Sequence, residues 1–540
     1  MITRRSMMSA SALTLASCTT PISRSGTSGS SVLADWASLA DHFVCPDWFR
    51  DAKFGIWSHW GPQCVPERGD WYGRQMYIQG NSYYDFHVEE YGHPSKFGFL
   101  DIIGRWRGDK WDPADLVSKY KAAGAQYIVS MANHHDNFDT YDSRHHDWNA
   151  TRVGPGIDIV GTWEREVRKA GLRFGVSNHS AHAWHWWQTA YGYDAEGPLQ
   201  GRRYDAFRLT RRDGKGTWWD GLDPQRLYTG PSMVAPDGLT EISTMNAWHE
   251  AHDGQWLETL PVNNPYFAAN WLARQQDLVE KYRPDLVYMD NYGLPLEQFG
   301  LDAAAHYYRQ SIERDGHLDV VLTGKKLSPM QRRALVDDVE RGFVQDIRPE
   351  PWQTCTCIGD WHYDRRIFAE KRYKSARQIV QRLCDIVSKN GNLLLSVPQR
   401  GDGSIDEEEE KVLAGLAGWM AVNGEAIFAS RPWRVFGEGP TKAVEGMQNE
   451  DKAGAFTAKD IRFTQKKGAL YAAFLEWPEG PVRILALGKG SGLIRSATLL
   501  GHGPVQFAQT ERGLEVIMPS PAPAALVPIL RLEGDTALFD

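Results

Sequence analysis

Five polar side chains stand where runs of apolar residues end, which is where the C-terminal end of a buried strand would lie. The run at 286–289 ends at Asp290, and comparable runs end at four histidines: His59, His134, His135 and His179. The C-terminal ends of parallel strands meet at one edge when the strands close into a barrel. These side chains could therefore face one pocket, although an aspartate in this position also commonly caps the next helix or turn.

Carboxylates, hydrogen-bonding histidines and aromatic walls together are the groups that glycoside hydrolysis requires. One carboxylate attacks the anomeric carbon, while a second protonates the departing oxygen and then activates a water molecule. Asp290 is the natural candidate for the attacking carboxylate. The chain also contains 22 Trp residues, an unusually high number. Such rings can fill a core or stack on sugar rings, and composition alone does not distinguish these roles.

A metal hydrolase is the competing interpretation of the same residues, because histidine and aspartate are also metal ligands. The adjacent pair His134 and His135 has poor geometry for one ion, and the chain has no HExxH motif and no cysteine-rich spacing. We therefore expect neither a metal nor another cofactor.

A regular alternation of strand-like and helix-like segments surrounds these residues. Strands are predicted at 54–61, 127–132, 174–179, 285–290, 319–323 and 393–398, and helices at 111–124, 157–170, 265–282, 297–314, 375–389 and 405–422. This alternation is typical of a parallel α/β barrel. We therefore predict the α/β fold class, with a (β/α)8-like TIM barrel at residues 35–430 that carries the catalytic site.

Two regions depart from that alternation. Residues 181–262 are rich in Trp, His, Gly and charge without clear periodicity, so we expect a long loop insertion over the mouth of the barrel, where it would influence substrate selectivity. Residues 431–540 contain short alternating strands with Gly, Pro and Lys turns, which predict a C-terminal antiparallel β-sandwich. The sandwich has few strand-end histidines or carboxylates, which favours an accessory role.

The N-terminus has the features of an export signal. Residues 1–18 combine a cationic start with a short, mildly apolar run, and Leu15-Ala16-Ser17-Cys18 resembles a bacterial lipobox that would place a lipid on Cys18. A plain signal peptide with a coincidental cysteine is the alternative. Residues 19–34, rich in Ser, Thr and Gly, predict a flexible tether. We therefore expect export to the bacterial periplasm, or to the outer membrane as a lipoprotein.

Charge and cysteine content exclude several other classes of protein. A formal net charge of −8 gives no basic surface for nucleic acid. Without Cys18, five cysteines remain, an odd and sparse set that favours buried free thiols over a disulfide scaffold. No apolar stretch beyond the N-terminus is long enough to cross a membrane, so a lipid anchor on Cys18 is the one membrane contact we expect. The oligomeric state stays open.

Several blocks of the chain, in order, resemble those of the glycoside hydrolase family 29 α-L-fucosidases. They cover about residues 46 to 435 and are FGIWSHWG at 54–61, NHHDNF at 133–138, VYMDN at 287–291, WQTC at 352–355 with WHY at 361–363, IVSKNGNLLLSV at 386–397, DGSI at 402–405 and NGEAIF at 423–428. The resemblance implies a retaining exo-α-L-fucosidase with a barrel and a C-terminal β-sandwich, acting on fucosylated or related L-sugar glycans.

The same resemblance implies roles for individual residues. It makes Asp290 the nucleophile and makes four residues sugar-binding: His59, Trp71, His134 and His135. The acid/base residue of the family falls in a poorly matched region, where Glu340 and Glu350 are both candidates. We prefer Glu340 for its compact Val-Glu-Arg-Gly context, whereas Glu350 stands between two prolines.

Departures from the family pattern cluster around the expected pocket, where we also expect His179 and Tyr288 to bind the sugar. The chain has Tyr288-Met289 where the family usually has Trp-Phe, Asn291 for Gly, Asn133 for Lys and Gln353 for Glu, and His179 stands in an unusual block. The sugar could therefore be L-fucose, a decorated fucose or a near relative such as L-galactose. The departures also leave open a third alternative, a surface protein that binds the sugar without cleaving it.

Overall fold

The computed structural model describes residues 31–452, 454–520 and 526–539. The predicted export signal, Cys18 and all but the last four residues of the predicted tether lie outside these residues. Within them, no helix combines the length and apolar character that crossing a membrane requires.

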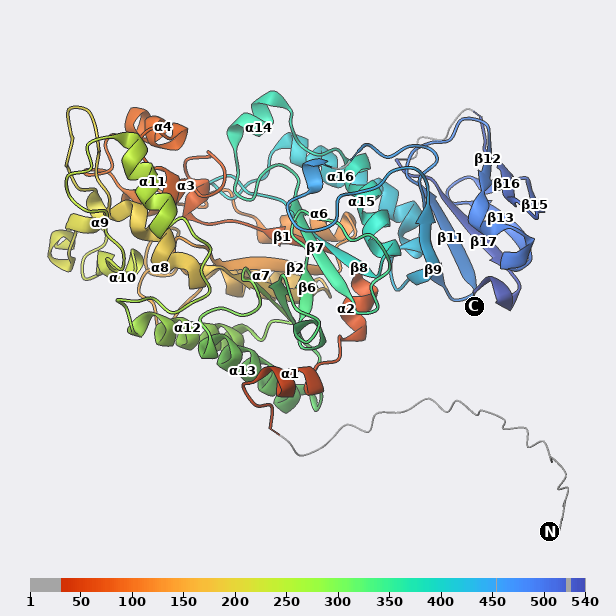
Figure 1. Cartoon of the computed structure of the whole chain (residues 1–540), viewed down its shortest axis with the longest axis horizontal. Helices are drawn as coiled ribbons and strands as arrows, with labels where there is room; N and C mark the ends of the chain where they lie inside the picture. The colour runs from red at the N-terminus through yellow and green to blue at the C-terminus, as the bar shows by residue number, and fades with distance from the viewer. Residues whose placement is uncertain (1–30, 453, 521–525, 540) are drawn as a thin grey trace, which may run out of the picture. The chain divides into compact units, whose positions relative to one another are not determined.

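Eight parallel strands form a closed barrel in the order of the sequence, from β1 to β8. Figure 1 labels five of them, β1, β2, β6, β7 and β8, near the middle of the view. The barrel strands are β1 Phe54–Ser58, β2 Tyr127–Asn133, β3 Arg173–Asn178, β4 Leu286–Met289, β5 Val321–Lys325, β6 Val336–Asp338, β7 Trp352–Cys357 and β8 Gly391–Ser396. Side chains such as Trp57, Val129 and Leu394 fill the interior. The barrel is therefore a packed core whose strand ends carry the site, and the predicted fold class is confirmed.

Helices connect most of these strands, and several begin where the sequence places a cap. The helices are α1 Trp36–His42, α2 Asp47–Ala52, α3 Tyr72–Gln75, α4 Ser82–Glu90, α5 Phe99–Ile103, α6 Pro113–Ala122, α7 Ile159–Lys169, α8 Ala183–Trp186, α9 Asp205–Arg208, α10 Pro224–Leu227, α11 Ile242–His252, α12 Tyr266–Tyr282, α13 Gln298–Asp315, α14 Arg365–Glu370, α15 Ala376–Ser388 and α16 Glu407–Asn423. Asp112 caps α6 with Pro113 in its first turn, and Asp406 caps α16 ahead of four glutamates that favour the helix dipole.

The structure extends the sequence prediction at three places. β5 runs to Lys325, two residues beyond the predicted strand, and two barrel strands, β6 and β7, were not predicted. The region 181–262, expected as a loop, contains the helices α8 to α11. In α8, which has four residues, the side chains of Trp184, His185 and Trp186 are all buried, so the segment shows no periodic apolar face.

The C-terminal part consists of two antiparallel sheets. The first has the order β14-β13-β17-β11-β10-β9 and the second the order β12-β16-β15. Their strands are β9 Arg431–Glu438, β10 Ile461–Lys466, β11 Ala469–Phe474, β12 Pro481–Ile484, β13 Ile494–Leu499, β14 Gly503–Pro504, β15 Phe507–Thr510, β16 Gly513–Ile517 and β17 Ile529–Gly534. The first sheet contacts α15 through an ion pair between Arg462 and Asp385 with an N···O distance of 2.6 Å.

The five cysteines of the described residues are free thiols, as the sequence predicts. Cys64, Cys355, Cys357 and Cys384 are buried, whereas Cys45 is partly exposed. Burial raises the pKa of the Cys64 thiol to about 12, which keeps it in the unreactive protonated form.

Candidate active site

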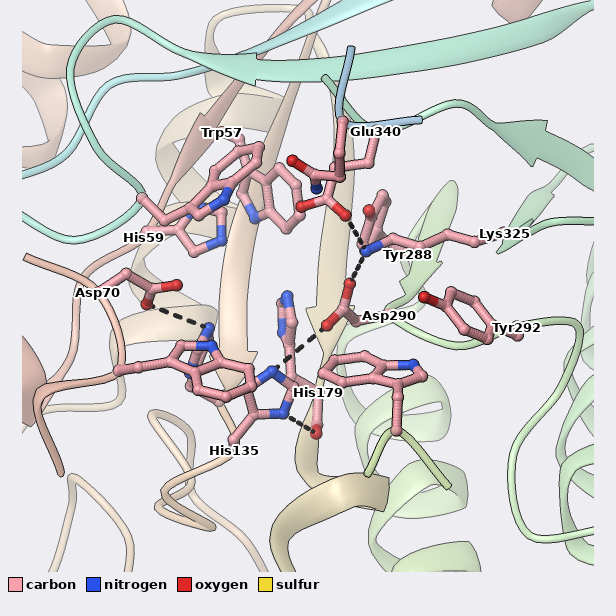
Figure 2. Close-up of a pocket in the computed structure, with 15 residues that line it drawn as sticks. Trp57, His59, Asp70, His135, His179, Tyr288, Asp290, Tyr292, Lys325 and Glu340 are labelled. Atoms are coloured by element: carbon pink, nitrogen blue, oxygen red, sulfur yellow. Dashed lines mark hydrogen bonds and ion pairs between the residues drawn. The ribbon is translucent and has the colours of Figure 1, made fainter. Parts of the chain in front are cut away.

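A cavity of about 280 Å³ opens at the C-terminal ends of the barrel strands, and Figure 2 shows the side chains that line it. They are Trp57, His59, Asp70, Trp71, His134, His135, His179, Trp256, Tyr288, Asp290, Tyr292, Lys325, Glu340, Trp361 and Gln448. Eight of the nine site residues predicted from the sequence are among them. The exception is Glu350, which is exposed and lies outside the cavity.

Asp290 follows β4 directly and is buried in this cavity. One carboxylate oxygen bonds the Lys325 ammonium, and the other lies 3.4 Å from His135 Nε2. Burial alone would raise the pKa of Asp290, but the charge of Lys325 and the hydrogen bond from His135 hold that pKa well below its usual range. Asp290 is therefore an ionised carboxylate that faces the cavity. It does not cap the next helix, because α13 begins after Glu297.

Lys325 is the last residue of β5 and joins two carboxylates of the cavity, those of Asp290 and Glu340 (Figure 2). Its Nζ donates to Asp290 Oδ1 and also to Glu340 Oε2 at 2.7 Å. Burial would lower the pKa of Lys325, yet the negative charges of Asp290 and Glu340 hold it well above its usual range. One buried cation therefore compensates two carboxylates that would otherwise repel each other.

The histidines form one side of the cavity and are held by second hydrogen bonds. His59 Nδ1 lies 2.9 Å from Ser396 Oγ, His135 Nδ1 lies 3.0 Å from the carbonyl of His179, and His179 Nδ1 lies 3.1 Å from the carbonyl of Asn133. Burial lowers the pKa of His179 to about 3 and holds the pKa values of His59 and His134 well below their usual range. Neutral imidazoles present one donor and one acceptor nitrogen, a set that suits sugar hydroxyls.

Aromatic rings form the remaining walls. Tyr288 packs on Trp57 with ring centroids 4.4 Å apart, and its hydroxyl donates to Asp338 at 3.0 Å. Trp71 lies nearly parallel to Trp256, with centroids 6.2 Å apart and planes inclined by 10°. The cavity therefore combines flat apolar surfaces with hydrogen-bonding groups, which is the combination that a pyranose ring requires.

The region 181–262, expected over the mouth of the barrel, contributes Trp256 to the cavity. Glu258 fixes this part of the chain to the end of β4. Its carboxylate accepts the side-chain amide of Asn291 at 2.6 Å and the backbone N–H of Tyr292 at 2.7 Å. Asn291, one of the departures from the family pattern, therefore anchors the insertion beside Asp290.

Seven lining residues were not among the predicted site residues: Trp57, Asp70, Trp256, Tyr292, Lys325, Trp361 and Gln448. Three of them carried a signal, because Trp57 and Trp361 belong to blocks that resemble the family and Asp70 precedes Trp71. Asp70 accepts a hydrogen bond from His362 Nδ1 at 2.6 Å. Lys325 would have been found if the predicted strand had been extended by two residues.

In the part of the chain that the structure describes, three groups of side chains could supply ligands to a metal ion. They are His59, His134 and His179; Asp70, His134 and His362; and His135, His182 and Asp290. The carboxylates of these groups already have partners, because Asp70 bonds His362 and Asp290 bonds the Lys325 ammonium. A divalent cation at Asp290 would lie beside the Lys325 ammonium, and the repulsion between the two positive charges disfavours binding there.

A parallel barrel whose strand ends bring two carboxylates, neutral histidines and tryptophans into one cavity defines the class of barrel glycoside hydrolases. The family model "Alpha-L-fucosidase" matches residues 22–425, and the model "Alpha-L-fucosidase C-terminal domain" matches residues 454–533. The chain therefore belongs to the α-L-fucosidase family, and the resemblance of its sequence blocks is confirmed.

Individual relatives agree with this assignment over most of the chain. The tissue α-L-fucosidase of Rattus norvegicus is 26% identical over 501 residues, which cover 91% of this chain and 89% of the relative. The plasma α-L-fucosidase of the same species is 27% identical, covering 90% and 89%. Among solved structures, the Thermotoga maritima α-fucosidase in complex with a mechanism-based inhibitor superposes with a TM-score of 0.66 at 25% identity, covering 93% of this chain and 99% of that chain.

Proposed function

We propose that this glycoside hydrolase releases terminal α-L-fucose, or a close relative, from glycans with retention of configuration. Asp290 is the nucleophile and Glu340 the acid/base residue. The observation that carries the proposal is that both carboxylates bond the same ammonium group, that of Lys325, inside one cavity.

The shared ammonium limits the distance between the two carboxylates. Their nearest oxygens cannot be further apart than two hydrogen-bond lengths, roughly 6 Å. Retaining glycosidases hold their carboxylates about 5 to 5.5 Å apart, whereas inverting enzymes need about 6.5 to 9.5 Å to admit a water molecule. The geometry therefore supports direct attack by Asp290 on the anomeric carbon and a covalent glycosyl-enzyme ester.

Lys325 contacts both carboxylates that take part in the proposed reaction. When Asp290 becomes a neutral ester, Glu340, which also bonds the Lys325 ammonium, takes the proton from the attacking water. The same three side chains thus take part in both half-reactions.

The remaining lining residues are suited to one uncharged sugar ring. A cavity of about 280 Å³ is small for a ligand site, which favours a single terminal sugar over an internal segment of a polysaccharide. Its charged side chains are Asp70, Asp290 and Glu340 against Lys325, with His59, His134 and His179 kept neutral by burial. This negative balance disfavours a sulfated ring at the bottom of the cavity.

The stereochemistry of the first product tests the proposal. Wild-type protein is mixed with an aryl α-L-fucoside and followed by proton NMR, where we expect the α anomer of L-fucose to appear before mutarotation. An initial β anomer would instead indicate inversion. Binding without turnover on L-fucosides, L-galactosides and sulfated fucosides would favour the sugar-binding alternative, and loss of activity in EDTA that zinc restores would favour the metal hydrolase.

Replacement of Lys325 by methionine is expected to lower kcat/KM for the aryl fucoside by about 10²–10³-fold, the range for loss of one preorganised charge in an active site. Because Lys325 keeps the pKa of Asp290 low, that pKa should rise in the variant. A smaller fraction of Asp290 is then ionised at a given acidic pH, so the acidic limb of the kcat/KM profile should move to higher pH.

Two further variants control for this effect. Lys325→Arg keeps the positive charge and should keep the acidic limb near its wild-type position. Lys326→Met removes an exposed charge from the next residue and should leave the limb in place. An unchanged rate and an unchanged limb in Lys325→Met would contradict the assigned role of this lysine.

We also propose that the chain is exported, which the cationic and apolar pattern of residues 1–18 supports. Incorporation of a radiolabelled fatty acid that is lost in Cys18→Ala would identify the lipoprotein form, and absence of the label would favour a plain signal peptide.

A further inference from the structure

The connection between β9 and β10 of the C-terminal part reaches into the cavity. Gln448, which lies on this connection, is one of the residues that line it. Residues 446–450, here called the 446–450 segment, lie between the matched ranges 22–425 and 454–533 of the two family models. Neither model therefore covers this part of the cavity.

Backbone hydrogen bonds join the 446–450 segment to the residues around Glu340. Gln448 N donates to the carbonyl of Glu340 at 2.9 Å, and Asn449 N and Glu450 N donate to the carbonyl of Arg341 at 3.0 and 2.9 Å. Gly446 and Phe343 exchange both of their backbone hydrogen bonds, at 3.0 and 3.3 Å. The connection between β9 and β10 thus holds the backbone of Glu340 directly.

The 446–450 segment packs closely against the residues around Glu340, and ion pairs stabilise this contact. A Cβ atom on Gly342 would lie 2.2 Å from the carbonyl oxygen of Gly446, so only glycine allows this approach. The Glu450 carboxylate lies 3.2 Å from Arg382 Nη1 and accepts the Thr356 hydroxyl at 2.8 Å. Burial alone would raise the pKa of Glu450, but Arg382 and its other partners lower it, which keeps the carboxylate ionised. The 446–450 segment is therefore a fixed part of the site.

Gln448 is an exposed residue that lines the cavity. Within residues 31–452, 454–520 and 526–539, its backbone N–H donates to the carbonyl of Glu340, whereas its side-chain amide makes no hydrogen bond. The residue adopts φ +56°, a left-handed conformation that is uncommon for glutamine. Its amide, with two donor hydrogens and one acceptor oxygen, is therefore free to bond a ligand in the cavity.

The position of Glu340 indicates which part of the substrate the Gln448 amide would contact. An acid that protonates the departing oxygen must lie within hydrogen-bond reach of it, so the leaving group occupies the space beside Glu340. We propose that Gln448 belongs to the subsite for the leaving group and hydrogen-bonds a hydroxyl or amide of the sugar to which the fucose is attached. This inference rests on the proposed function, because it takes Glu340 as the acid.

Two substitutions that suit a left-handed backbone test the proposal. Gln448→Gly removes the amide, whereas Gln448→Asn retains one, and both residues adopt positive φ readily. Each variant is assayed on α-L-fucosyl fluoride, which has no sugar as leaving group, and on disaccharides in which α-L-fucose is linked to galactose or to N-acetylglucosamine. Gln345→Ala is the matched control, because the Gln345 amide bonds the carbonyl of Ala443 on the same connection outside the cavity.

The measured quantity is the ratio of kcat/KM on a disaccharide to kcat/KM on the fluoride. We expect Gln448→Gly to lower this ratio about three- to tenfold on at least one disaccharide, the effect of one hydrogen bond between uncharged groups. Gln448→Asn should restore part of the ratio, and Gln345→Ala should leave it at the wild-type value.

An unchanged ratio on every disaccharide would overturn the inference, as would an equal loss on the fluoride and the disaccharides, because a purely structural role affects all substrates alike. Failure of the proposed function would look different: wild-type protein would not cleave the fluoride, or Glu340→Gln would behave like the wild type on every substrate.

Discussion

Replacement of Asp290 by glycine is expected to lower kcat for an aryl α-L-fucoside by at least about 10⁴-fold, the scale seen when a covalent nucleophile is removed from an enzyme. The reason is that no other carboxylate can replace it in the ester. Asp70 is engaged by His362, and Glu340 is bonded to Lys325. The rate is measured from the release of the phenol.

External azide provides the internal control for the Asp290 variant. Glycine leaves a space where the carboxylate stood, so azide can attack the anomeric carbon from that side and restore part of the activity. The product should be the β-L-fucosyl azide, which NMR identifies. Wild-type kcat in Asp290→Gly would exclude Asp290 as the nucleophile. A well-folded variant that azide does not rescue would indicate that another group attacks the anomeric carbon.

Replacement of Glu340 by glutamine should lower kcat about 10²–10⁴-fold for substrates with a poor leaving group, because the departing oxygen is no longer protonated. Fucosyl fluoride, whose leaving group needs little help from an acid, should be affected much less. Brønsted plots of log kcat against the pKa of the leaving phenol should therefore become steeper in the variant.

Glu350 supplies the matched control for Glu340, since it is the other carboxylate that the sequence offered for this role. Glu350 is exposed and outside the cavity, so Glu350→Gln should retain wild-type kinetics on both kinds of substrate. A steeper dependence on the leaving group in Glu350→Gln, with none in Glu340→Gln, would reverse the assignment.

The barrel could be predicted because its strands and helices have sequence signals within a few residues of their ends. Apolar runs that end in polar residues, caps such as Asp112 and a terminal glycine after α6 are signals within a few residues of each other. The same logic found the residues at the ends of β1 to β4, including His59 and Asp290. These side chains reach the cavity because strand ends meet there, whatever the details of packing.

The parts that were missed depend on contacts between distant segments. β6 has three residues, Val336–Asp338, which is too short for a periodic pattern, so the position of Glu340 relative to the barrel could not be fixed. Trp256 follows α11 in a stretch without regular structure, and it reaches the cavity because Glu258 bonds residues beyond β4. Gln448 lies in a domain that was expected to be accessory. None of these arrangements has a local signal in the sequence.

The connection from β9 to β10 also bears on how such an enzyme can diversify. It is tied to the Glu340 region by backbone hydrogen bonds, so a residue such as Gln448, whose side chain makes none, can change without loss of those bonds. Glu450 differs, because its carboxylate bonds Thr356 and Arg382. Substitutions at positions such as 448 would leave the barrel strands, the sandwich core and the pair formed by Asp290 and Lys325 in place. A new preference for the attached sugar could therefore evolve by a few changes in this connection, while the catalytic chemistry remains the same.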